Sequence, residues 1–482
     1  MQANSNARTS AKKCWKHKAL YPLAIIWMLG APASVIAEQQ ADDNAYVALG
    51  FISHLIEQAL DFDPQLRSVY MEYKAGLEET RISRAGFYPK VDLRAGYRHE
   101  KSDNIYTDTD SGYYNPDLPR SSGQLDDTYW QLSVSQKIID WRTIAEHRRA
   151  SAVVSEVEHR LRQAEQELLM RTTEATLTAL YHAQQLYLHE TRLRALEMKE
   201  RQVARQYDLG VGARIDVLEV RAHLDIARSE LLEVRDALRA AKTRVANITG
   251  QPLQLPSEWI VSAHLAQTVD QDEDESFWME RITNNSEYLI MQNRLEQERA
   301  SLSASKAGYY PDLSLNMTHN VVNSDDEFRE RTDTTISLDF TIPIYHGGHT
   351  SASVRRATAR VGAQQARLDS IIANVREETQ LAYSRRLSQA ELVSALKQSR
   401  ESSQQYLFAA ERGEDMGLRS PVDVLDARAQ FLETELQLAR ALHEYLQADL
   451  SLHYQAGELD LSRVATYDMM FSQAASAYLH KQ

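Results

Sequence analysis

The strongest constraint on this chain is an internal duplication. The stretch SRAGFYPKVDL at Ser83–Leu93 returns as SKAGYYPDLSL at Ser305–Leu315, 222 positions later. The stretch DVLEVRA, which begins at Asp216, returns as DVLDARA from Asp423, 207 positions later. The difference, 222 − 207 = 15 residues, indicates an insertion between these motifs in the first half. The sequence therefore predicts a tandem repeat of a unit of about 200 residues.

Each half contains two stretches in which apolar and polar residues alternate. We expect them to be strands at about residues 88–99 and 128–139 in the first half, and 310–322 and 333–345 in the second. Alternation over this length is typical of a strand with one apolar and one polar face.

The composition of the remaining sequence, rich in Gln, Glu, Ala, Arg and Leu, favours long helices. We expect helices at 45–86, 141–207 and 215–249 in the first half, and at 285–308, 351–412 and 421–456 in the second. Apolar residues spaced by 3 and 4, as in Val154, Val157 and Leu161, predict coiled-coil packing. Short turns with glycine, at 208–214 and 413–419, would fold each pair of long helices into a hairpin.

The N-terminus is typical of a secretory signal peptide. Basic residues precede the apolar run 20–33, and the small residue Ala37 ends the segment, so residues 1–37 are the predicted leader. A single membrane anchor is the alternative, but polar sequence follows the short run too soon. The single cysteine, Cys14, precedes the apolar run and is therefore not a lipid-attachment site. The mature chain would have no disulfide.

Charge and hydropathy argue against a nucleic-acid-binding protein and against a protein with transmembrane helices. Removal of residues 1–37, with five basic and no acidic residues, changes the net charge from −14 to −19. This charge opposes binding to nucleic acid. No later segment has the ~18 consecutive apolar residues of a transmembrane helix, so a chain that spans a membrane here must do so with strands.

Four strands are too few to close a membrane barrel with an open lumen, and unpaired strand edges are costly in lipid. Several copies must therefore combine their strands, and three copies would supply about twelve. The helices, at ~100 Å each, would continue the barrel as a tube. In the repeated motif, Pro89 and Pro311 would end a helix and start a strand. The neighbouring aromatic pairs, Phe87-Tyr88 and Tyr309-Tyr310, would lie at the membrane boundary.

These motifs resemble the TolC-like outer-membrane efflux and secretion channels, also called outer membrane factors. The resemblance covers nearly all of residues 38–460. It rests on AGxYPxxxL twice, SQKIIDW, TIPIYHGG, YDLGVGARIDVLEVRA and EDMGLRSPVDVLDARAQ. It implies a mainly α fold with membrane β: a homotrimer with a twelve-stranded barrel in the outer membrane of a Gram-negative bacterium and an α-helical periplasmic tunnel. It also implies a passive channel without cofactors, in contact with outer-membrane lipid, a periplasmic adaptor and an inner-membrane ABC or proton-driven transporter.

The duplication and the resemblance together divide the chain. The predicted parts are a signal peptide at 1–37, a first repeat at 38–250, an equatorial linker at 251–284, a second repeat at 285–457 and an equatorial C-terminal tail at 458–482.

The resemblance assigns Asp423 and Asp426 to the pore constriction. Their spacing of three places them on one helix face, and a trimer would then carry two rings of carboxylates. From the residues alone, two solvated carboxylates favoured by the helix dipole are the better explanation, and the resemblance reverses that preference. The first half has acidic residues at the same positions, Asp216 and Glu219.

The resemblance also assigns a latch and docking turns. Arg419 would pair with Asp216 of a neighbouring hairpin to hold the tip shut. Glu414 stands where the family usually has tyrosine, and it would strengthen the pairing of Arg419 or add negative charge at the mouth. The tips would dock the adaptor, although glycine in such a turn needs no further function. The docking residues are Gly210, Val211, Gly417 and Leu418.

The remaining motifs indicate neither a metal site nor a catalytic site. His346–His349 (HGGH) is better explained as a sharp strand-to-helix turn than as a metal site. We find no catalytic motif and expect no enzyme activity. The sequence predicts the exit duct of a tripartite export machine, for type I protein secretion or multidrug efflux. The alternative is a periplasmic adaptor with helical hairpins. The cargo stays open among proteins, drugs and metals.

Overall fold

The computed structural model of the protein describes residues 50–102, 110, 112, 123–255, 274–325 and 329–479. All of these belong to one compact unit, residues 47–482. The predicted signal peptide, most of the loop between the first two strands and residues 256–273 lie outside the described residues.

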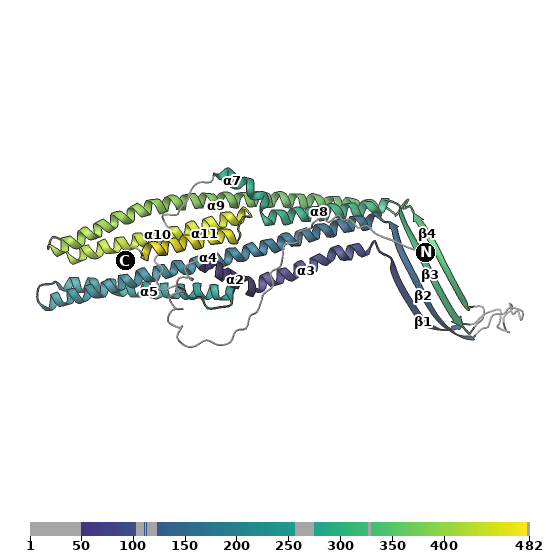
Figure 1. Cartoon of the computed structure of the whole chain (residues 1–482), viewed down its shortest axis with the longest axis horizontal. Coiled ribbons are helices and arrows are strands. Elements are labelled where there is room, and N and C mark those ends of the chain that lie inside the picture. The colour runs from purple at the N-terminus through teal and green to yellow at the C-terminus, as the bar shows by residue number, and fades with distance from the viewer. Residues whose placement is uncertain are drawn as a thin grey trace, which may run out of the picture. The chain divides into compact units, whose positions relative to one another are not determined.

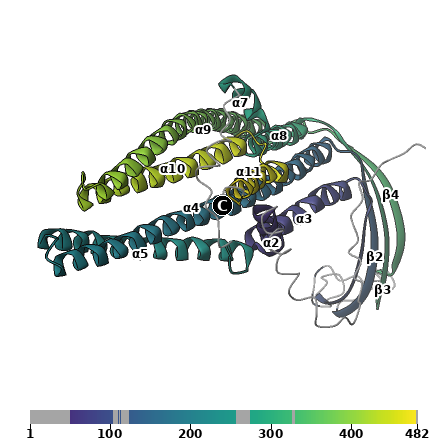
Figure 2. The same ribbon diagram turned by 60° about the vertical axis from the view of Figure 1, so that its left-hand side comes forward.

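The sheet contains four antiparallel strands in the order β1-β2-β3-β4. They are β1 (Lys90–Ser102), β2 (Gly123–Ile139), β3 (Asp312–Ser324) and β4 (Arg331–Thr341). Each coincides with a predicted strand, with ends shifted by up to five residues. β4 ends before its predicted limit at 345, where Pro343 has no N–H for strand pairing. The sheet is curved (Figure 2), and it lies at the opposite end of the unit from the turns of the helical hairpins (Figure 1).

Strand pairing gathers the apolar residues of both halves on one face of the sheet. Leu93 of β1 lies opposite Leu132 of β2. Leu315 of β3 lies opposite Leu338 of β4. The outer members of these pairs, Leu93 and Leu338, are 69% and 65% exposed. An uncovered apolar face of this extent is suited to contact with lipid rather than water.

The first repeat is built on one very long helix. α4 (Trp141–Asp208) has 68 residues, which corresponds to about 100 Å. α5 (Arg214–Thr249) returns along it, and α3 (Pro64–Ala85) packs against it nearer the sheet. α2 (Phe51–Phe62) precedes α3.

The structure corrects the first predicted helix, 45–86, which is two helices separated at Asp63. Asp63 is the N-cap of α3, and its Oδ1 accepts a hydrogen bond from the Leu66 N–H at 2.8 Å. Pro64 occupies the first turn of α3, where its missing N–H is tolerated. The same proline cannot continue a helix from α2, so α3 begins anew.

The second repeat copies the first. Its helices are α8 (Ser286–Lys306), the 3₁₀ turn η2 (Ala307–Tyr309), α9 (His349–Asp415) and α10 (Pro421–Gln455). The N-cap of α8 is Asn285, 222 positions after Asp63, so the duplication includes the caps. Among the described helices, none is both long enough and apolar enough to cross a membrane.

The repeated glycine of AGFYP and AGYYP marks a close approach between helices. A Cβ added at Gly86 would lie 2.8 Å from Cγ2 of Thr143. A Cβ at Gly308 would lie 3.0 Å from Cγ2 of Thr350. The two threonines are 207 positions apart, so both halves make the same contact. Glycine at this position lets the chain pass from helix to strand against the start of α4 or α9.

Short helices surround the long helices at mid-length. They are α7 (Glu275–Arg281) and η1 (Ile282–Asn284) in the predicted equatorial linker, and α11 (Leu461–Leu479) in the predicted tail. Asp468 of α11 caps α2, because its carboxylate accepts the N–H groups of Ile52 at 2.8 Å and Ser53 at 3.0 Å. Tyr467 and Phe471 extend the same buried core. The tail is thus bound to the start of the described chain.

A buried ion cluster fixes α11 to the second hairpin. Asp449 of α10 lies 2.9 Å from Nε of Arg386 and 2.8 Å from Nη2 of Arg463, and it accepts the Tyr467 hydroxyl at 2.7 Å. Burial would raise the pKa of Asp449, but the charges of Arg463 and His453 and the hydrogen bond from Tyr467 hold it below its usual range. The carboxylate therefore remains ionised and ties together three helices.

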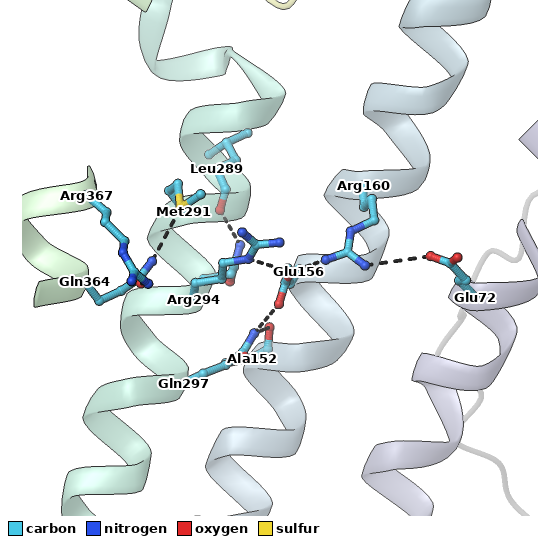
Figure 3. Close-up of polar contacts among 11 residues, drawn as sticks. Glu72, Ala152, Glu156, Arg160, Leu289, Met291, Arg294, Gln297, Gln364 and Arg367 are labelled. Carbon is cyan, nitrogen blue, oxygen red and sulfur yellow. Dashed lines mark hydrogen bonds and ion pairs between the residues drawn. The ribbon is translucent and has the colours of Figure 1, made fainter. Parts of the chain in front are cut away.

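A second network of polar contacts joins α3, α4 and α8 (Figure 3). Glu156 of α4 accepts hydrogen bonds from Arg294 at 2.9 Å and Gln297 at 2.6 Å, both on α8. Nη2 of Arg160 lies 2.5 Å from Oε1 of Glu156, and its Nη1 lies 3.8 Å from Oε2 of Glu72 on α3. Burial would raise the pKa of Glu156, but the hydrogen bonds and positive charges outweigh it and lower the pKa. Charge-assisted hydrogen bonds thus join α4 to α8, and an ion pair joins α4 to α3.

Candidate gate at the helical hairpin tips

The two hairpin tips have the same backbone structure. After α4, the Val211 N–H donates to the Gln206 carbonyl at 3.0 Å, and the Gly210 N–H donates to Tyr207 at 2.9 Å. Gly210 has φ +74°, a value that glycine adopts without strain. This pair of bonds is a Schellman motif, which satisfies the last carbonyls of the helix.

The second tip repeats the motif after α9. The Leu418 N–H donates to the Gly413 carbonyl at 2.8 Å, and the Gly417 N–H donates to Glu414 at 2.8 Å. Gly417 has φ +73°. The structure thus places all four predicted docking residues at equivalent positions of two matching turns.

The tips expose apolar side chains. Val211 and Leu418 are 78% and 76% exposed, and Leu209 and Met416 beside them are also exposed. Apolar residues at the end of a charged helical hairpin are costly to leave in water. Each hairpin tip thus exposes apolar side chains in the described structure.

Asp423 closes the N-terminus of α10. Its carboxylate accepts the Ser420 N–H at 2.9 Å, while the Ser420 hydroxyl accepts the Asp423 N–H at 3.1 Å. This reciprocal pair is a capping box. The hydrogen bonds from the Ser420 backbone and hydroxyl, helped by the charge of Arg419, lower the pKa of Asp423. The carboxylate is therefore charged at neutral pH and held in a fixed place.

Asp426 lies almost one turn further along α10 and is exposed. Within the described residues it makes no ion pair or hydrogen bond through its carboxylate. Asp216 is half-buried in the first turn of α5. These three carboxylates stand at the same end of the unit, but the single chain does not bring them into contact.

Arg419 is exposed and has no ion-pair partner among the described residues. Its stem packs against Gly413, where an added Cβ would lie 2.8 Å from the arginine Cγ. The predicted pairing with Asp216 is absent within one chain. That pairing was expected between neighbouring hairpins, so it stays a prediction.

Glu414 has a partner that the sequence did not reveal. Its Oε1 lies 2.5 Å from Nζ of Lys199 on α4, and it does not pair with Arg419. This contact joins α9 to α4, and so joins the two hairpins. No repeat or spacing links residues 199 and 414, and only packing brings them together.

The other singled-out residues have structural roles. His346 and His349 flank the turn before α9, and the His349 N–H donates to the His346 carbonyl at 3.0 Å. Within the described residues no group of three or more potential metal ligands comes together.

Comparison with known proteins identifies the family. Residues 55–251 and 281–458 match the family described as "Outer membrane efflux protein". Alkaline protease secretion protein AprF of Pseudomonas aeruginosa is 24% identical over 440 residues, which are 90% of this chain and 88% of AprF. Proteases secretion protein PrtF of Dickeya chrysanthemi is 26% identical over 411 residues, 84% of this chain and 87% of PrtF. The crystal structure of outer membrane protein VceC from Vibrio cholerae has a TM-score of 0.69 at 18% identity, and covers 86% of this chain and 98% of VceC.

A sheet with one apolar face, continued by long helical hairpins, is the architecture of an outer-membrane channel protomer. The chain belongs to the outer membrane efflux protein family. It is an outer-membrane protein of an export system, and the predicted resemblance is confirmed. The adaptor alternative is not supported, because the family match covers both repeats.

Proposed function

We propose that three copies of this chain form the exit duct of a type I protein secretion machine. The duct is passive and carries out no chemistry. It is closed at the hairpin tips and opens when a periplasmic adaptor and an inner-membrane ABC transporter engage those tips.

One observation supports this proposal most directly: the sheet has an uncovered apolar face and two unpaired edges in a chain of this family. Among the described residues, β1 pairs only with β2, and β4 pairs only with β3. In a bilayer, every backbone N–H and C=O needs a partner within the protein. Combining the strands of three copies would give the backbone groups of both edges hydrogen-bond partners. It would also expose Leu93, Leu338 and their neighbours to lipid.

The tips support a gate. Asp423 is charged and fixed by its capping box, and Asp426 lies exposed on the same helix. Three copies around an axis would place rings of carboxylates at the mouth, a constriction that favours cations. Arg419 is free to pair with a carboxylate of the next copy, as the predicted latch requires. The exposed Val211 and Leu418 would provide the apolar contact for the adaptor.

The choice of cargo rests on the relatives. AprF and PrtF are named for the secretion of proteases. Efflux of small molecules is the second candidate, since the family description names efflux. The same duct could export either proteins or small molecules, so the inner-membrane transporter attached to it determines the cargo.

Two measurements test the proposal. Light scattering of the purified protein in detergent should give the mass of three chains, and a monomer would refute the duct. In a strain that lacks this gene, export of a protein substrate by its ABC transporter and adaptor should stop and return with the intact gene. If drug resistance falls while protein export is unchanged, the efflux candidate replaces secretion.

A further inference from the structure

The first half of the chain neutralises an arginine near the sheet. Arg160 of α4 pairs with Glu156 of its own helix and with Glu72 of α3 (Figure 3). The guanidinium group therefore has a carboxylate on either side, and its positive charge is balanced locally.

The repeat equivalent of this arginine in the second half lacks both partners. It is Arg367 of α9, 207 positions later. The equivalent of Glu156 at the same offset is Ala363, and the equivalent of Glu72 at an offset of 222 is Arg294. Arg367 is exposed, and its Nη1 donates a hydrogen bond to Oε1 of Gln364 at 3.3 Å (Figure 3). The second half thus has the arginine without its counter-ions.

Arg367 belongs to a row of exposed arginines on α9. We call Arg356, Arg360 and Arg367 the arginine stripe. They lie within about 40° of one another around the helix, because each residue turns the chain by about 100°. None of the three makes an ion pair among the described residues, and residues 349–368 contain neither Asp nor Glu. The charge of the stripe is therefore not neutralised by its own helix.

The stripe lies on the side of the helices that continues the polar face of the sheet. A cavity between α3, α4 and α8 is lined by Lys90 and Arg149. Lys90 lies opposite Ser135, on the polar face of β1 and β2. Arg356 is the repeat equivalent of Arg149, so the duplication places it on the same side of α9. In the proposed duct, whose apolar face contacts lipid, this side faces the lumen.

The carboxylates on this side do not cancel the stripe. Glu79 and Glu146 line the cavity together with Lys90 and Arg149, so the cavity itself is balanced in charge. In the second half, Asp312 at the start of β3 is the equivalent of Lys90. One carboxylate offsets one of the three arginines of the stripe, and two positive charges per copy remain in excess.

We propose that the arginine stripe binds acidic segments of the exported protein as they pass through the duct. The inference rests on the proposed function and adds a substrate class to it, polypeptides with segments rich in Asp and Glu. A guanidinium group can hold a carboxylate through two parallel hydrogen bonds, and it does not lose its charge in proteins.

The dimensions of the stripe suit an extended polypeptide. From Arg356 to Arg367 the helix rises about 16 Å, at 1.5 Å per residue. About five residues of extended chain cover this distance. Ion pairs between exposed groups are weak, so the stripe would hold a passing segment briefly and release it. Phosphate groups of lipids carry the same charge, but lipid contacts the apolar face and the stripe continues the polar one.

Block of the channel current by a polyanion tests the proposal. Poly-glutamate, added on the side of the sheet, should block channels of the purified protein in planar bilayers, and added salt should weaken the block. Replacing all three arginines of the stripe by Gln should raise the half-blocking concentration by about tenfold or more. Replacing all three by Lys should keep most of the block, because the charge stays. The melting temperature of each variant checks that it folds as the parent does.

The same helix offers a matched control. Arg376 is exposed and makes no ion pair among the described residues, and it lies on roughly the opposite side of α9 from the stripe. Arg367→Gln and Arg376→Gln each remove one positive charge, but only Arg367→Gln should weaken the block. Block by poly-lysine should not weaken in any stripe variant.

The outcomes separate the stripe from the duct. Unchanged poly-glutamate block in conducting channels of the triple Gln variant overturns the stripe and leaves the duct in place. Equal weakening in Arg367→Gln and Arg376→Gln would show an effect of overall charge, and overturns the stripe as well. If the triple Gln variant loses stabilisation by phosphatidylglycerol while the block is unchanged, lipid headgroups are the ligand and the inference is wrong. A parent protein that forms no channel overturns both proposals.

Discussion

Lys199 of α4 and Glu414 of α9 form an ion pair with an Nζ–Oε1 distance of 2.5 Å. Their side chains are only 10% and 20% exposed, so solvent screens this pair less than an ordinary surface pair. The contact joins the two hairpins of one protomer near the tips. Any outward movement of one hairpin relative to the other must break it.

We predict that Glu414→Gln weakens the closed state. The substitution keeps the shape but removes the charge, and leaves Lys199 without its counter-ion. The coupling between the two residues should be about 1–2 kcal/mol in a double-mutant cycle. Purified trimers in planar bilayers should conduct more in the closed state. The exchanged pair, Lys199→Glu with Glu414→Lys, should restore low conductance. Unchanged conductance in Glu414→Gln would exclude a latch here.

Arg419→Ala should increase ion leakage without destabilising the single chain. Arg419 has no ion-pair partner within the described residues, so we expect its ion pair to form with another copy. Closed-state conductance measures the leak, and the thermal unfolding of the detergent-dissociated chain serves as the control. A large loss of stability in that control, with unchanged conductance, would assign Arg419 a local role on Gly413 instead.

Asp426→Asn should weaken block by a multivalent cation such as hexaamminecobalt. The loss of one carboxylate per copy should reduce blocker affinity by about tenfold or more, equivalent to ~1.4 kcal/mol. Asp423→Asn should have a similar effect while keeping an acceptor for the Ser420 N–H. Asp423→Ala should in addition lose the cap of α10, about 1 kcal/mol. Unchanged block in Asp426→Asn would place that residue away from the constriction.

Gly86→Ala should destabilise the junction between helix and strand by about 1–3 kcal/mol, because its Cβ would collide with the Thr143 methyl group. The melting temperature of the trimer measures the effect. Thr143→Ser removes that methyl group and should restore much of the loss. Gly362→Ala is the matched control: nothing lies within 4 Å of its added Cβ, so it should stabilise α9 by roughly 0.5–1 kcal/mol.

Acidification should destabilise the protein between pH 6.5 and 4. Burial lowers the pKa of His443 and of His453 to about 4, despite the opposing charges of Glu444 and Asp449. The unfolded chain, with histidine pKa near ~6.5, takes up protons first as the pH falls. Stability from these neutral histidines is therefore complete above pH 6.5 and is lost on the way to pH 4.

His443→Phe tests this effect. The phenyl ring can keep the stacking on Tyr181, whose ring centroid lies 4.8 Å from that of His443, but it does not titrate. The melting temperature of the variant should fall less between pH 7 and pH 5 than that of the parent. An identical pH dependence would show that His443 does not contribute.

The sequence by itself determined the repeat, the type of each long element and the chemistry of the sheet. The offsets of 222 and 207 residues predicted two equivalent halves, and alternation predicted all four strands with their apolar face. These features are local or periodic, so they can be recognised from the sequence alone. Proline and glycine also marked most helix ends, although the start of α3 at Pro64 was overlooked within the predicted helix 45–86.

Only the tertiary structure decided which side chains meet. Glu414 was expected to strengthen the pairing of Arg419 or to add negative charge at the mouth, and only the packing of α9 on α4 shows its contact with Lys199. Leu218 and Leu425 are equivalent in the sequence, yet only the fold shows that one is covered and the other is not. The Asp468 cap on α2 joins residues more than 400 positions apart. Contacts of this kind depend on how whole helices lie against each other, and no local pattern of residues carries that information.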